Sequence, residues 1–499
     1  MPPLLSRLAL LAGLAVSAGG CDPGPAGTVQ VAVIAPVIAP VSPREPRIVD
    51  PAATAPQPGD EVLLANVAQG LVRFDARGQI EPGLAERWNV SDDGLSYIFR
   101  LPAAAEWPDG RKISAHQVGR ILRRHVGKTS RNPLKDALGA VTEIVAMTDR
   151  VLEIRLAAPR PHLLQLLAQP ELALVREGLG TGPFMLVDER GPEGELRLRR
   201  LVADPDEEER QEELWLRGTD AATAVRAFAA GKLDLALGGT FDDLAVARSA
   251  RLQRGTLRFD PVAGLFGLIP ARATGPLAVP ELRRLLNEAI DRDALLTALA
   301  VPGLAARATV LEARLAGLPD PTPPPWTATP IGERRPELIT RADTLFGDTE
   351  RPTIRVALPD GPGARLLLAR LTADWGLLGL GVEAAGPGRP ADLRLIDAVA
   401  PTTSPVWFLR RFRCAAAAIC SVPADELLHA ARIAPVDAQR RLFFFQAAQL
   451  IEAEQLFLPI AAPVRWSLVS DRIEGFATNR FARHTLTGLE QRLGREGTE

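Results

Sequence analysis

The sequence predicts a mixed α/β protein with two or three domains. Helical and strand patterns alternate along the whole chain, which is typical of the α/β class. At 499 residues the chain is longer than one hydrophobic core usually organises. Its content of 46% hydrophobic and 24% charged residues is ordinary for a globular protein. The formal net charge of -2, with no basic patch interleaved with aromatic residues, argues against nucleic-acid binding.

Residues 1–20 have the features of a bacterial signal peptide. An apolar segment at residues 8–18 is too short to span a bilayer, and small residues follow it. Cys21 comes next, at the position where a lipoprotein signal places its lipidated cysteine. Several acyl chains on Cys21 would give stable membrane anchoring. We therefore expect a periplasmic protein, tethered through residues 21–27 to the inner membrane.

Two details of this segment bear on the anchor. Ala18 stands where lipoprotein signals usually have Leu, so soluble secretion after cleavage at the small residues is the alternative. Asp22 resembles the residue that retains lipoproteins at the inner membrane of enteric bacteria. That location suits a protein that meets a membrane-embedded partner.

The next part of the chain predicts a strand followed by a helix. Residues on one face of the strand are large and apolar, which is the period-two pattern of a half-buried strand. They are Leu95, Tyr97, Phe99 and Leu101. Ser114 and Gln117 have the spacing of a capping box, which predicts a helix start there. Turn residues at 91–94 and 108–110 separate these elements.

Similar local patterns continue further along. Residues 151–156 alternate as a strand, and Gly231 is placed as the residue that ends a helix. A helix is predicted over residues 281–292, with one apolar face at helical spacing. That face consists of Leu282, Leu285, Leu286 and Ala289. Residues 318–325 read as a Pro-rich surface loop, since proline is rigid and lacks a backbone donor.

The order of these motifs resembles the extracytoplasmic solute-binding proteins of family 5, the peptide and nickel receptors of ABC importers. The motifs of the opening signature are Gly70–Val72, Pro82–Ala85, Trp88, Asp92–Gly94, Tyr97–Phe99, Pro108–Gly110 and Ser114–Ala115. Later segments that match the family lie at residues 180–184, 228–234 and 281–292. The resemblance therefore extends over most of the mature chain and points to a protein that binds rather than one that catalyses.

The resemblance implies an α/β, two-lobed periplasmic binding protein fold with a hinge and an additional N-terminal subdomain, type II-like and of cluster C. Lobe I would comprise residues 28–60, 172–262 and 466–499, with residues 61–171 as its subdomain. Lobe II would comprise residues 263–465. The two chain crossings are expected near residues 259–269 and 459–466.

No pattern in the sequence indicates an enzyme or a metal site. The five histidines are scattered, without HExxH spacing, and no GxSxG motif occurs. Residues 127–129 look like the tail of a phosphate-binding loop, but Leu122 stands where its first glycine belongs. We therefore expect no catalytic residue, metal or cofactor; a hydrolase is the least favoured alternative.

Cys414 and Cys420 are the only other cysteines. In an oxidising periplasm we expect them to pair, if the alanine-rich loop between them forms a turn. If residues 415–419 instead form a regular helix, the sulfurs lie about 9 Å apart along the axis, which is too far to bridge. Metal binding with His429 matches no common ligand spacing.

Residues 397–409 correspond to the part of the family that reads the ligand. The resemblance implies that an Asp before a turn and an aliphatic-aromatic helix pairs with the amino group of a peptide. Here Pro401 takes the place of that Asp and Ser404 replaces the Asp of the turn, while Asp397 lies four residues upstream. Pro270 stands near the position of the family's hinge Asn. The candidate ligand-binding residues are Asp397, Ser404 and Trp407.

The sequence thus predicts a substrate-binding lipoprotein of an ABC importer. It would capture a peptide or another small polar solute and deliver it to permease and ATPase subunits, acting as a monomer. The alternative is a receptor-like lipoprotein that has lost transport and acts as a sensor or scaffold. If Pro401 does replace the amine-binding Asp, peptides with a free amine should bind poorly, and Asp397 is the one nearby residue that could substitute.

Overall fold

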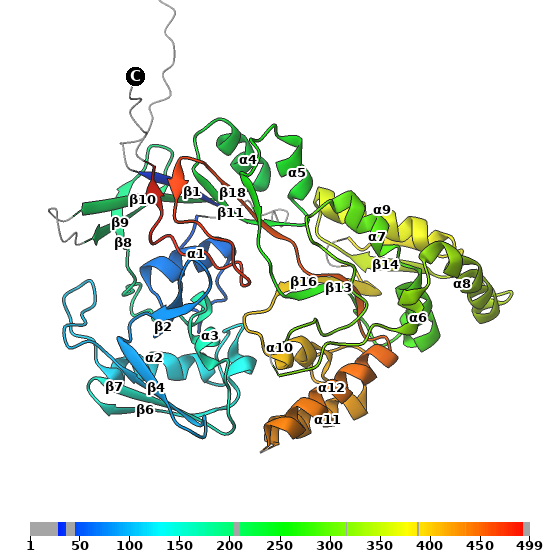
Figure 1. Ribbon diagram of the computed structural model, residues 1–499, viewed down its shortest axis with the longest axis horizontal. Helices are drawn as coiled ribbons and strands as arrows, with labels where there is room; N and C mark the ends of the chain where they lie inside the picture. The colour runs from blue at the N-terminus through cyan, green and yellow to red at the C-terminus, as the bar shows by residue number, and fades with distance from the viewer. Residues whose placement is uncertain are drawn as a thin grey trace, which may run out of the picture.

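The computed structural model describes residues 28–35, 45–202, 210–315, 317–386, 389–434 and 436–492, which form two lobes (Figure 1). The predicted signal peptide, the proposed lipidation site Cys21 and the tether lie outside these residues. Within the described part of the chain, no helix is both long enough and apolar enough to cross a membrane.

Lobe I is organised by a mixed sheet of seven strands over the described residues, in the order β12-β18-β11-β1-β10-β9-β8. β1 is parallel to both of its neighbours, and the other pairs are antiparallel. The strands are β1 (Val29–Ile34), β8 (Met185–Arg190), β9 (Leu196–Val202), β10 (Arg210–Thr219), β11 (Leu235–Thr240), β12 (Leu257–Phe259) and β18 (Arg465–Val469). The helices are α1 (Pro58–Val67), α4 (Ala221–Ala229) and α5 (Leu244–Ser249).

The N-terminal subdomain is built on an antiparallel sheet in the order β4-β5-β7-β6, seen at the lower left of Figure 1. Its elements are β4 (Arg87–Val90), β5 (Ser96–Arg100), α2 (Ala115–Val126), η1 (Lys135–Leu138), β6 (Val141–Thr148), β7 (Val151–Leu156), α3 (Leu163–Leu167) and η2 (Pro170–Leu172). Tyr97 and Phe99 are buried in its core, as the alternation predicted. Ser114 and Gln117 form the predicted capping box at the start of α2.

Lobe II contains a sheet in the order β15-β14-β16-β13-β17, with helices around it. The strands are β13 (Gly264–Pro270), β14 (Thr353–Ala357), β15 (Gly381–Ala384), β16 (Leu393–Val399) and β17 (Leu458–Ala461). The helices are η3 (Pro276–Ala278), α6 (Pro280–Ala289), α7 (Arg292–Leu299), η4 (Pro325–Ala328), α8 (Ile331–Phe346), α9 (Pro362–Gly376), α10 (Pro405–Leu409), η5 (Arg410–Phe412), α11 (Val422–Ile433) and α12 (Asp437–Ala453). All residues of β13, which lies between β16 and β17, are buried.

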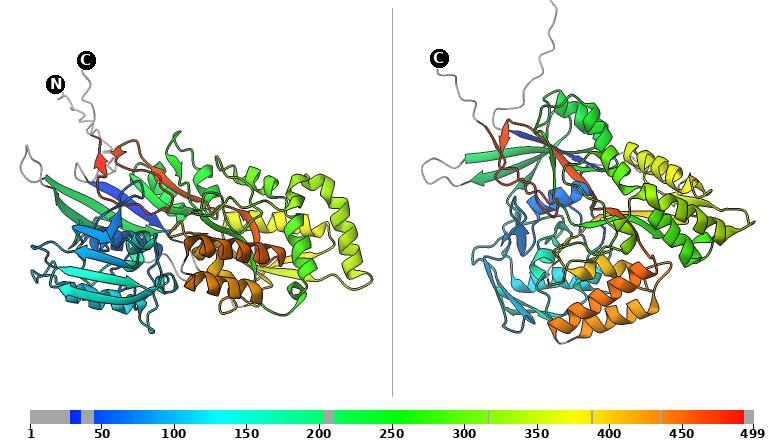
Figure 2. Two further views of the ribbon diagram at one scale, coloured as in Figure 1. Left: turned by 60° about the horizontal axis from the view of Figure 1, so that its bottom comes forward. Right: turned by 45° about the vertical axis from the view of Figure 1, so that its right-hand side comes forward.

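Two small strand pairs and the loops around them complete the described fold. β2 (Val72–Phe74) pairs with β3 (Ile80–Pro82), and β19 (Ile473–Glu474) pairs with β20 (Glu490–Gln491). The C-terminal segment between β19 and β20 runs back over α1 in lobe I (Figure 2, red). There the backbone N–H of Leu486 donates to the side chain of Asn66.

The predicted helix over residues 281–292 is divided in two. Its apolar face is buried as expected, but α6 ends at Ala289, and Asp291 begins α7 by accepting a hydrogen bond from the Ala294 N–H. Aspartate is a preferred N-cap residue because its carboxylate satisfies a free backbone N–H. The sequence interpretation missed this cap because it took Asp291 as the end of one helix.

The two lobes are joined by two short chain segments. Residues 260–263 connect β12 of the lobe I sheet to β13 of the lobe II sheet, and residues 462–464 connect β17 back to β18. Both segments lie within the ranges expected for the crossings. The hydrophobic core is continuous beside them, since Phe241 of lobe I meets Phe266 of lobe II edge to face, with ring centroids 4.8 Å apart.

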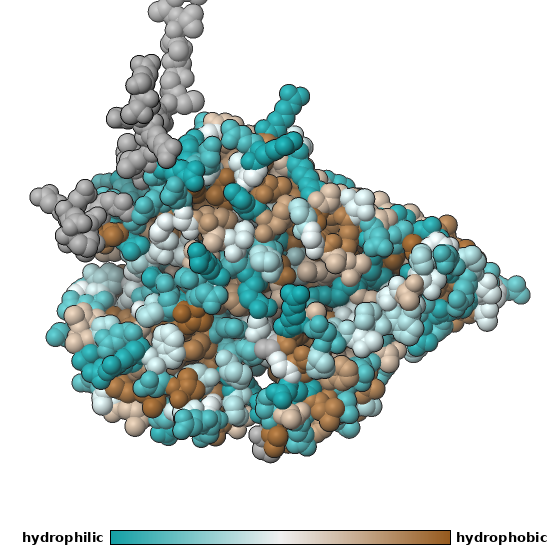
Figure 3. All heavy atoms as spheres, viewed as in Figure 1, coloured by the Kyte–Doolittle hydropathy of each residue, from teal (hydrophilic) through white to brown (hydrophobic). Residues whose placement is uncertain are grey.

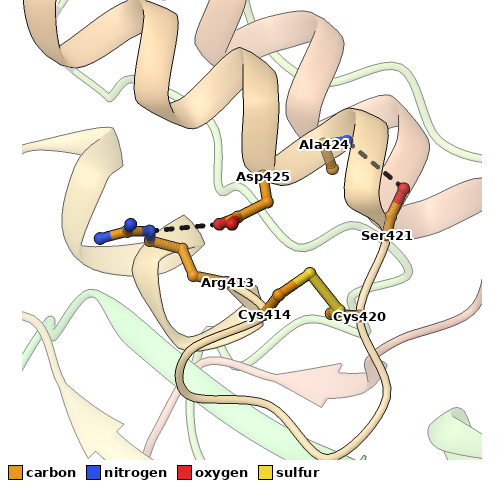
Figure 4. Close-up of a disulfide and its surroundings, with 6 residues drawn as sticks. All are labelled: Arg413, Cys414, Cys420, Ser421, Ala424 and Asp425. Carbon is orange, nitrogen blue, oxygen red and sulfur yellow. Dashed lines mark hydrogen bonds and ion pairs between the residues drawn. A yellow bond between two sulfur atoms is a disulfide. The ribbon is translucent and has the colours of Figure 1, made fainter.

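Cys414 and Cys420 form a disulfide with their Cα atoms 5.1 Å apart (Figure 4). Residues 414–416 form a turn and no helix continues through residue 420. Of the two alternatives that the sequence left open, this is the one in which the disulfide can form. The bridged loop leads directly into α11. There Ser421 accepts a hydrogen bond from the Ala424 N–H, and Arg413 lies 3.2 Å from Asp425.

Candidate ligand-binding site

A cavity of about 1030 Å³ lies between the two lobes. Both lobes contribute to its lining: β11 and the loop before α5 from lobe I, β16 and the α10–η5 segment from lobe II, and residues 481–484 near the C-terminus. The space-filling view has a notch at the lower centre, between the subdomain and the α11–α12 part of lobe II (Figure 3). A cavity of this size can enclose a small polar molecule or a short peptide.

Arg483 organises the part of the cavity formed by lobe I. Its guanidinium pairs with Glu61 of α1, lies 2.6 Å from Glu171 of η2 and donates to Gln169 at 3.0 Å. Although burial alone would lower it, Glu171 and Glu61 hold the pKa of Arg483 above its ordinary value. The positive charge of Arg483 is therefore balanced by acidic residues of the protein.

Asp397 lies on β16 and lines the cavity, but its carboxylate already has a partner. Arg465 at the start of β18 donates to Asp397 Oδ1 at 2.8 Å, and also to the carbonyl of Asp397. Burial raises the pKa of Asp397, and the charge of Arg465 opposes that rise. Asp397 and Arg465 come from different lobes, so this ion pair also joins the lobes next to the hinge.

Trp407 lines the cavity from α10, together with Arg410 and Arg411 of the adjoining η5 turn. The Arg411 guanidinium lies over the Trp407 ring at 5.2 Å from its centroid. Ser404 is not among the lining residues. It occupies the N-cap position of α10, where its backbone N–H donates to Thr402 Oγ1 at 3.2 Å. The structure thus brings Asp397 and Trp407 to the cavity and leaves Ser404 beside it.

Acidic residues line another part of the cavity, near α4, α5 and α9. Each of three aspartates accepts a hydrogen bond from its surroundings: Asp220 from the Thr223 N–H at 2.9 Å, Asp242 from the Ala364 N–H at 2.8 Å, and Asp243 from the Thr240 hydroxyl at 3.0 Å. Burial raises the pKa of both Asp242 and Asp243. These carboxylates cap helices and turns.

The loop at residues 401–403 is held by the N-terminal subdomain. Gln169 donates to the Pro401 carbonyl at 2.8 Å, and Gln165 accepts from the Thr403 N–H at 3.1 Å. His162 Nδ1 lies 3.1 Å from the Thr403 hydroxyl. We call these contacts the interlobe latch. Pro401 therefore presents its carbonyl to a protein side chain at the position where the resemblance implies an amine-binding Asp.

The sequence interpretation missed several residues of this site. Arg465, Arg483 and Gln169 give no local signal, because their partners lie far away in the sequence. Arg410 and Arg411 had a detectable signal, because two arginines directly follow the short apolar helix that the sequence singled out.

Comparisons with known proteins agree with this geometry. Residues 79–342, just over half of the chain, match the family described as bacterial extracellular solute-binding proteins, family 5 Middle. The chain belongs to this family. Its predicted family membership and its two-lobed fold are thereby confirmed, and the members of this family are binding proteins rather than enzymes.

Two relatives show how far the similarity extends. The probable di/tripeptide-binding protein 5 of Pseudomonas aeruginosa is 25% identical over 482 residues, which cover 83% of this chain and 88% of that protein. The probable deoxycholate-binding periplasmic protein YgiS of Escherichia coli is 29% identical over 144 residues, which cover 25% of this chain and 27% of that protein.

A solved structure supports the same fold. The murein tripeptide binding protein MppA of Escherichia coli superposes with a TM-score of 0.77 at 18% sequence identity, covering 93% of this family 5 chain and 98% of MppA. At this level of identity the agreement concerns the fold.

Proposed function

We propose that this family 5 protein is the receptor of an ABC importer, which captures a peptide or another small polar solute between its lobes and delivers it to a permease. The observation that carries this proposal is the cavity of about 1030 Å³ lined by both lobes. A ligand in this cavity contacts both lobes at once, so its binding favours the closed arrangement over the open one. Asp397 and Trp407 are the predicted binding residues that line the cavity.

The relatives narrow the ligand class. Several of them are named for binding dipeptides, tripeptides or oligopeptides, and one for binding deoxycholate. Peptides are therefore the first compounds to test. Native mass spectrometry of the protein purified from its own host should show a bound small molecule, and calorimetry should then give its affinity. A protein that carries nothing from its host and binds no member of a peptide collection would contradict the proposal.

We further propose that lipid on Cys21 anchors the protein to the outer face of the inner membrane. The support is the short apolar segment at residues 8–18, followed by small residues and cysteine. Cells given radioactive palmitate should label the wild-type protein and not a Cys21→Ser variant. Equal labelling of both proteins would contradict lipidation at Cys21 and would leave the proposed receptor function unaffected.

A further inference from the structure

Among the described residues that line the cavity, Arg410 and Arg411 are the cationic side chains that lack a counter-charge. Among the described residues, no carboxylate lies within 4.0 Å of either guanidinium, whereas Arg465 and Arg483 both have acidic partners in the same cavity. Arg410 Nη1 and Arg411 Nε are shielded from solvent and have no hydrogen-bond partner in the part of the chain that the structure describes. An unpaired buried charge is costly, so such groups usually serve a ligand or are paired in another state.

The surroundings of the two arginines favour an anion. Burial and the nearby charges of Arg410 and Arg394 lower the pKa of Arg411 to about 10, which leaves it protonated at neutral pH. Burial also lowers the pKa of Arg410, and Asp136 of η1 opposes that effect from outside ion-pair distance. Two adjacent guanidinium groups present several donors in a fixed geometry, which matches the two oxygens of a carboxylate.

The other arginines of the cavity are paired with carboxylates, and Asp220, Asp242 and Asp243 each accept a hydrogen bond from the protein. Asp397 is paired with Arg465, and Asp242 caps α9. Arg411 packs on the Trp407 ring, which holds the guanidinium in place beside the cavity without neutralising it. Among the described cavity residues, the cationic groups without a partner therefore lie on the α10–η5 segment, while Asp242 and Asp243, which have no cation within 4.0 Å, lie in the other part of the cavity near α5 and α9.

We propose that Arg410 and Arg411 form an anion subsite, which binds a carboxylate group of the captured solute beside Trp407. This inference rests on the proposed receptor function and adds the chemistry of one end of the ligand. It places a negative group of the ligand on the same lobe II segment where the resemblance implies an amine-binding Asp. The preferred ligand would thus carry a free carboxylate near α10.

The test uses a defined mixture incubated with the full-length mature protein. The mixture contains tripeptides of varied sequence, each present as a free acid and as a C-terminal amide. Each form is included with a free amine and with an acetylated amine, and small dicarboxylates and inorganic phosphate complete the mixture. Compounds that stay with the protein through gel filtration are identified by mass spectrometry, and the dissociation constant of the best one is measured by calorimetry. We expect the free acid to bind at least about 10-fold more tightly than its amide.

Variants separate the subsite from the general fold. Arg410→Gln and Arg411→Gln should each weaken the acid by about 10-fold or more and leave the amide nearly unchanged. Arg413→Gln is the matched control, because Arg413 pairs with Asp425 outside the cavity and should not alter the preference. Removing an unpaired charge should not lower the melting temperature, so the Arg410 and Arg411 variants should fold, and the Arg413 variant loses only a partly exposed ion pair, which contributes little to stability.

The outcomes are distinguishable. Binding of peptides without any preference for the acid, or with a preference that survives both Arg→Gln variants, would overturn the subsite and leave the receptor function standing. Retention of no carboxylate from this mixture would overturn the subsite, and the receptor function would fall only if the protein from its own host also carried no bound molecule. An Asp136→Asn variant tests the remaining alternative, because Asp136 lies near Arg410. If this variant and the two Arg→Gln variants all weaken the binding of the acid and of the amide equally, Arg410 serves lobe closure and does not bind the ligand.

Discussion

Asp397 is the residue at which the sequence and the structure lead to different expectations. From the sequence alone it is the one residue that could replace the missing amine-binding Asp. In the structure its carboxylate is 2.8 Å from Arg465, so its charge is already balanced before a ligand arrives. A carboxylate in this state offers little additional attraction to an ammonium group, because the nearby guanidinium repels that group.

An Asp397→Asn variant tests this expectation. It should change the ratio of affinities for a free-amine tripeptide and its N-acetyl analogue by less than about threefold, a difference below 1 kcal/mol. It should also lower the free energy of unfolding by roughly 2 kcal/mol, because Arg465 loses a charged hydrogen-bond partner. Calorimetry and urea denaturation measure the two effects.

Asp360→Asn is the matched control, since Asp360 lines the cavity with an exposed side chain and only a distant contact to Arg365 at 3.9 Å. A selective loss of free-amine binding in Asp397→Asn, but not in Asp360→Asn, would show that Asp397 is the amine-binding residue after all.

Glu452 gives a prediction about pH. It lies on α12, accepts a hydrogen bond from the Val310 N–H at 2.7 Å, and burial raises its pKa from 4.5 to about 7. The folded state therefore holds this proton more tightly than the unfolded state, so the contribution of Glu452 to stability is fully present below about pH 4.5, and it falls and is lost as pH rises to about 7. By about 1.4 kcal/mol per pKa unit, the fall is on the order of 3 kcal/mol.

A Glu452→Gln variant should remove this fall and keep the hydrogen bond to Val310. Urea denaturation at pH 4.5 and at pH 8 should then show the variant more stable than the wild type at pH 8 only. Glu426→Gln, on the exposed side of α11, is the control and should leave the profile of the wild type intact. A variant with the same pH profile as the wild type would contradict the assignment.

At the scale of elements, the disulfide holds the connection between η5 and α11. Its half-cystines are six residues apart, so it closes a small loop. Closing a loop of this size in the unfolded chain stabilises the fold by about 2 kcal/mol in the chain-entropy model. The same loop follows Arg410 and Arg411, so the bridge also limits how far the anion subsite can move.

We expect a Cys414→Ser, Cys420→Ser double variant to unfold at a lower urea concentration than the wild type. Dithiothreitol should lower the stability of the wild type to the level of the variant and leave the variant unchanged. If the reductant has no effect on the wild-type protein while mass spectrometry shows both thiols free, the bridge contributes nothing to stability.

Elements that depend on neighbouring residues could be predicted from the sequence. The buried face of β5 and the capping box of α2 are set by residues at most six positions apart, so the pattern carries the necessary information. The division at Ile290 was not predicted, although Asp291 has the residue type of an N-cap. The sequence interpretation took one helix to run from residue 281 to residue 292, which concealed the boundary between α6 and α7.

The site was only partly predictable for a physical reason. Asp397 and Arg465 are 68 positions apart, and Gln169 and Pro401 are 232 apart. No spacing rule indicates which of many charged residues meet across a cleft. The resemblance located the α10 region because its motif is continuous in the sequence. The lobe I residues that contact this region, such as Arg465 and Gln169, could be identified only from the three-dimensional structure.

At the scale of the whole molecule, the lobes are joined in three ways. The hinge segments 260–263 and 462–464 and the shared core around Phe241 and Phe266 form one side. The ion pair between Asp397 and Arg465 lies next to them. The interlobe latch connects the subdomain to residues 401–403 on lobe II. Opening the cavity about the hinge would break the latch and spare the shared core.

The latch is therefore expected to set the balance between closed and open forms. Gln169 donates to the Pro401 carbonyl across the lobes, whereas its bond from Arg483 lies within lobe I, so a Gln169→Ala variant removes one hydrogen bond that only the closed form makes. At about 1 kcal/mol for this bond, the closed population falls by roughly fivefold relative to the open one. The apparent affinity for a ligand that needs the closed form falls by a similar factor.

Small-angle scattering measures this prediction directly. Without ligand, Gln169→Ala should have a larger radius of gyration than the wild type, and saturating ligand should make both proteins equally compact. Gln446→Ala, on the exposed face of α12, should behave as the wild type in both measurements. If Gln169→Ala keeps the wild-type radius and the wild-type affinity, these contacts do not govern closure, and the hinge alone must set the open and closed populations.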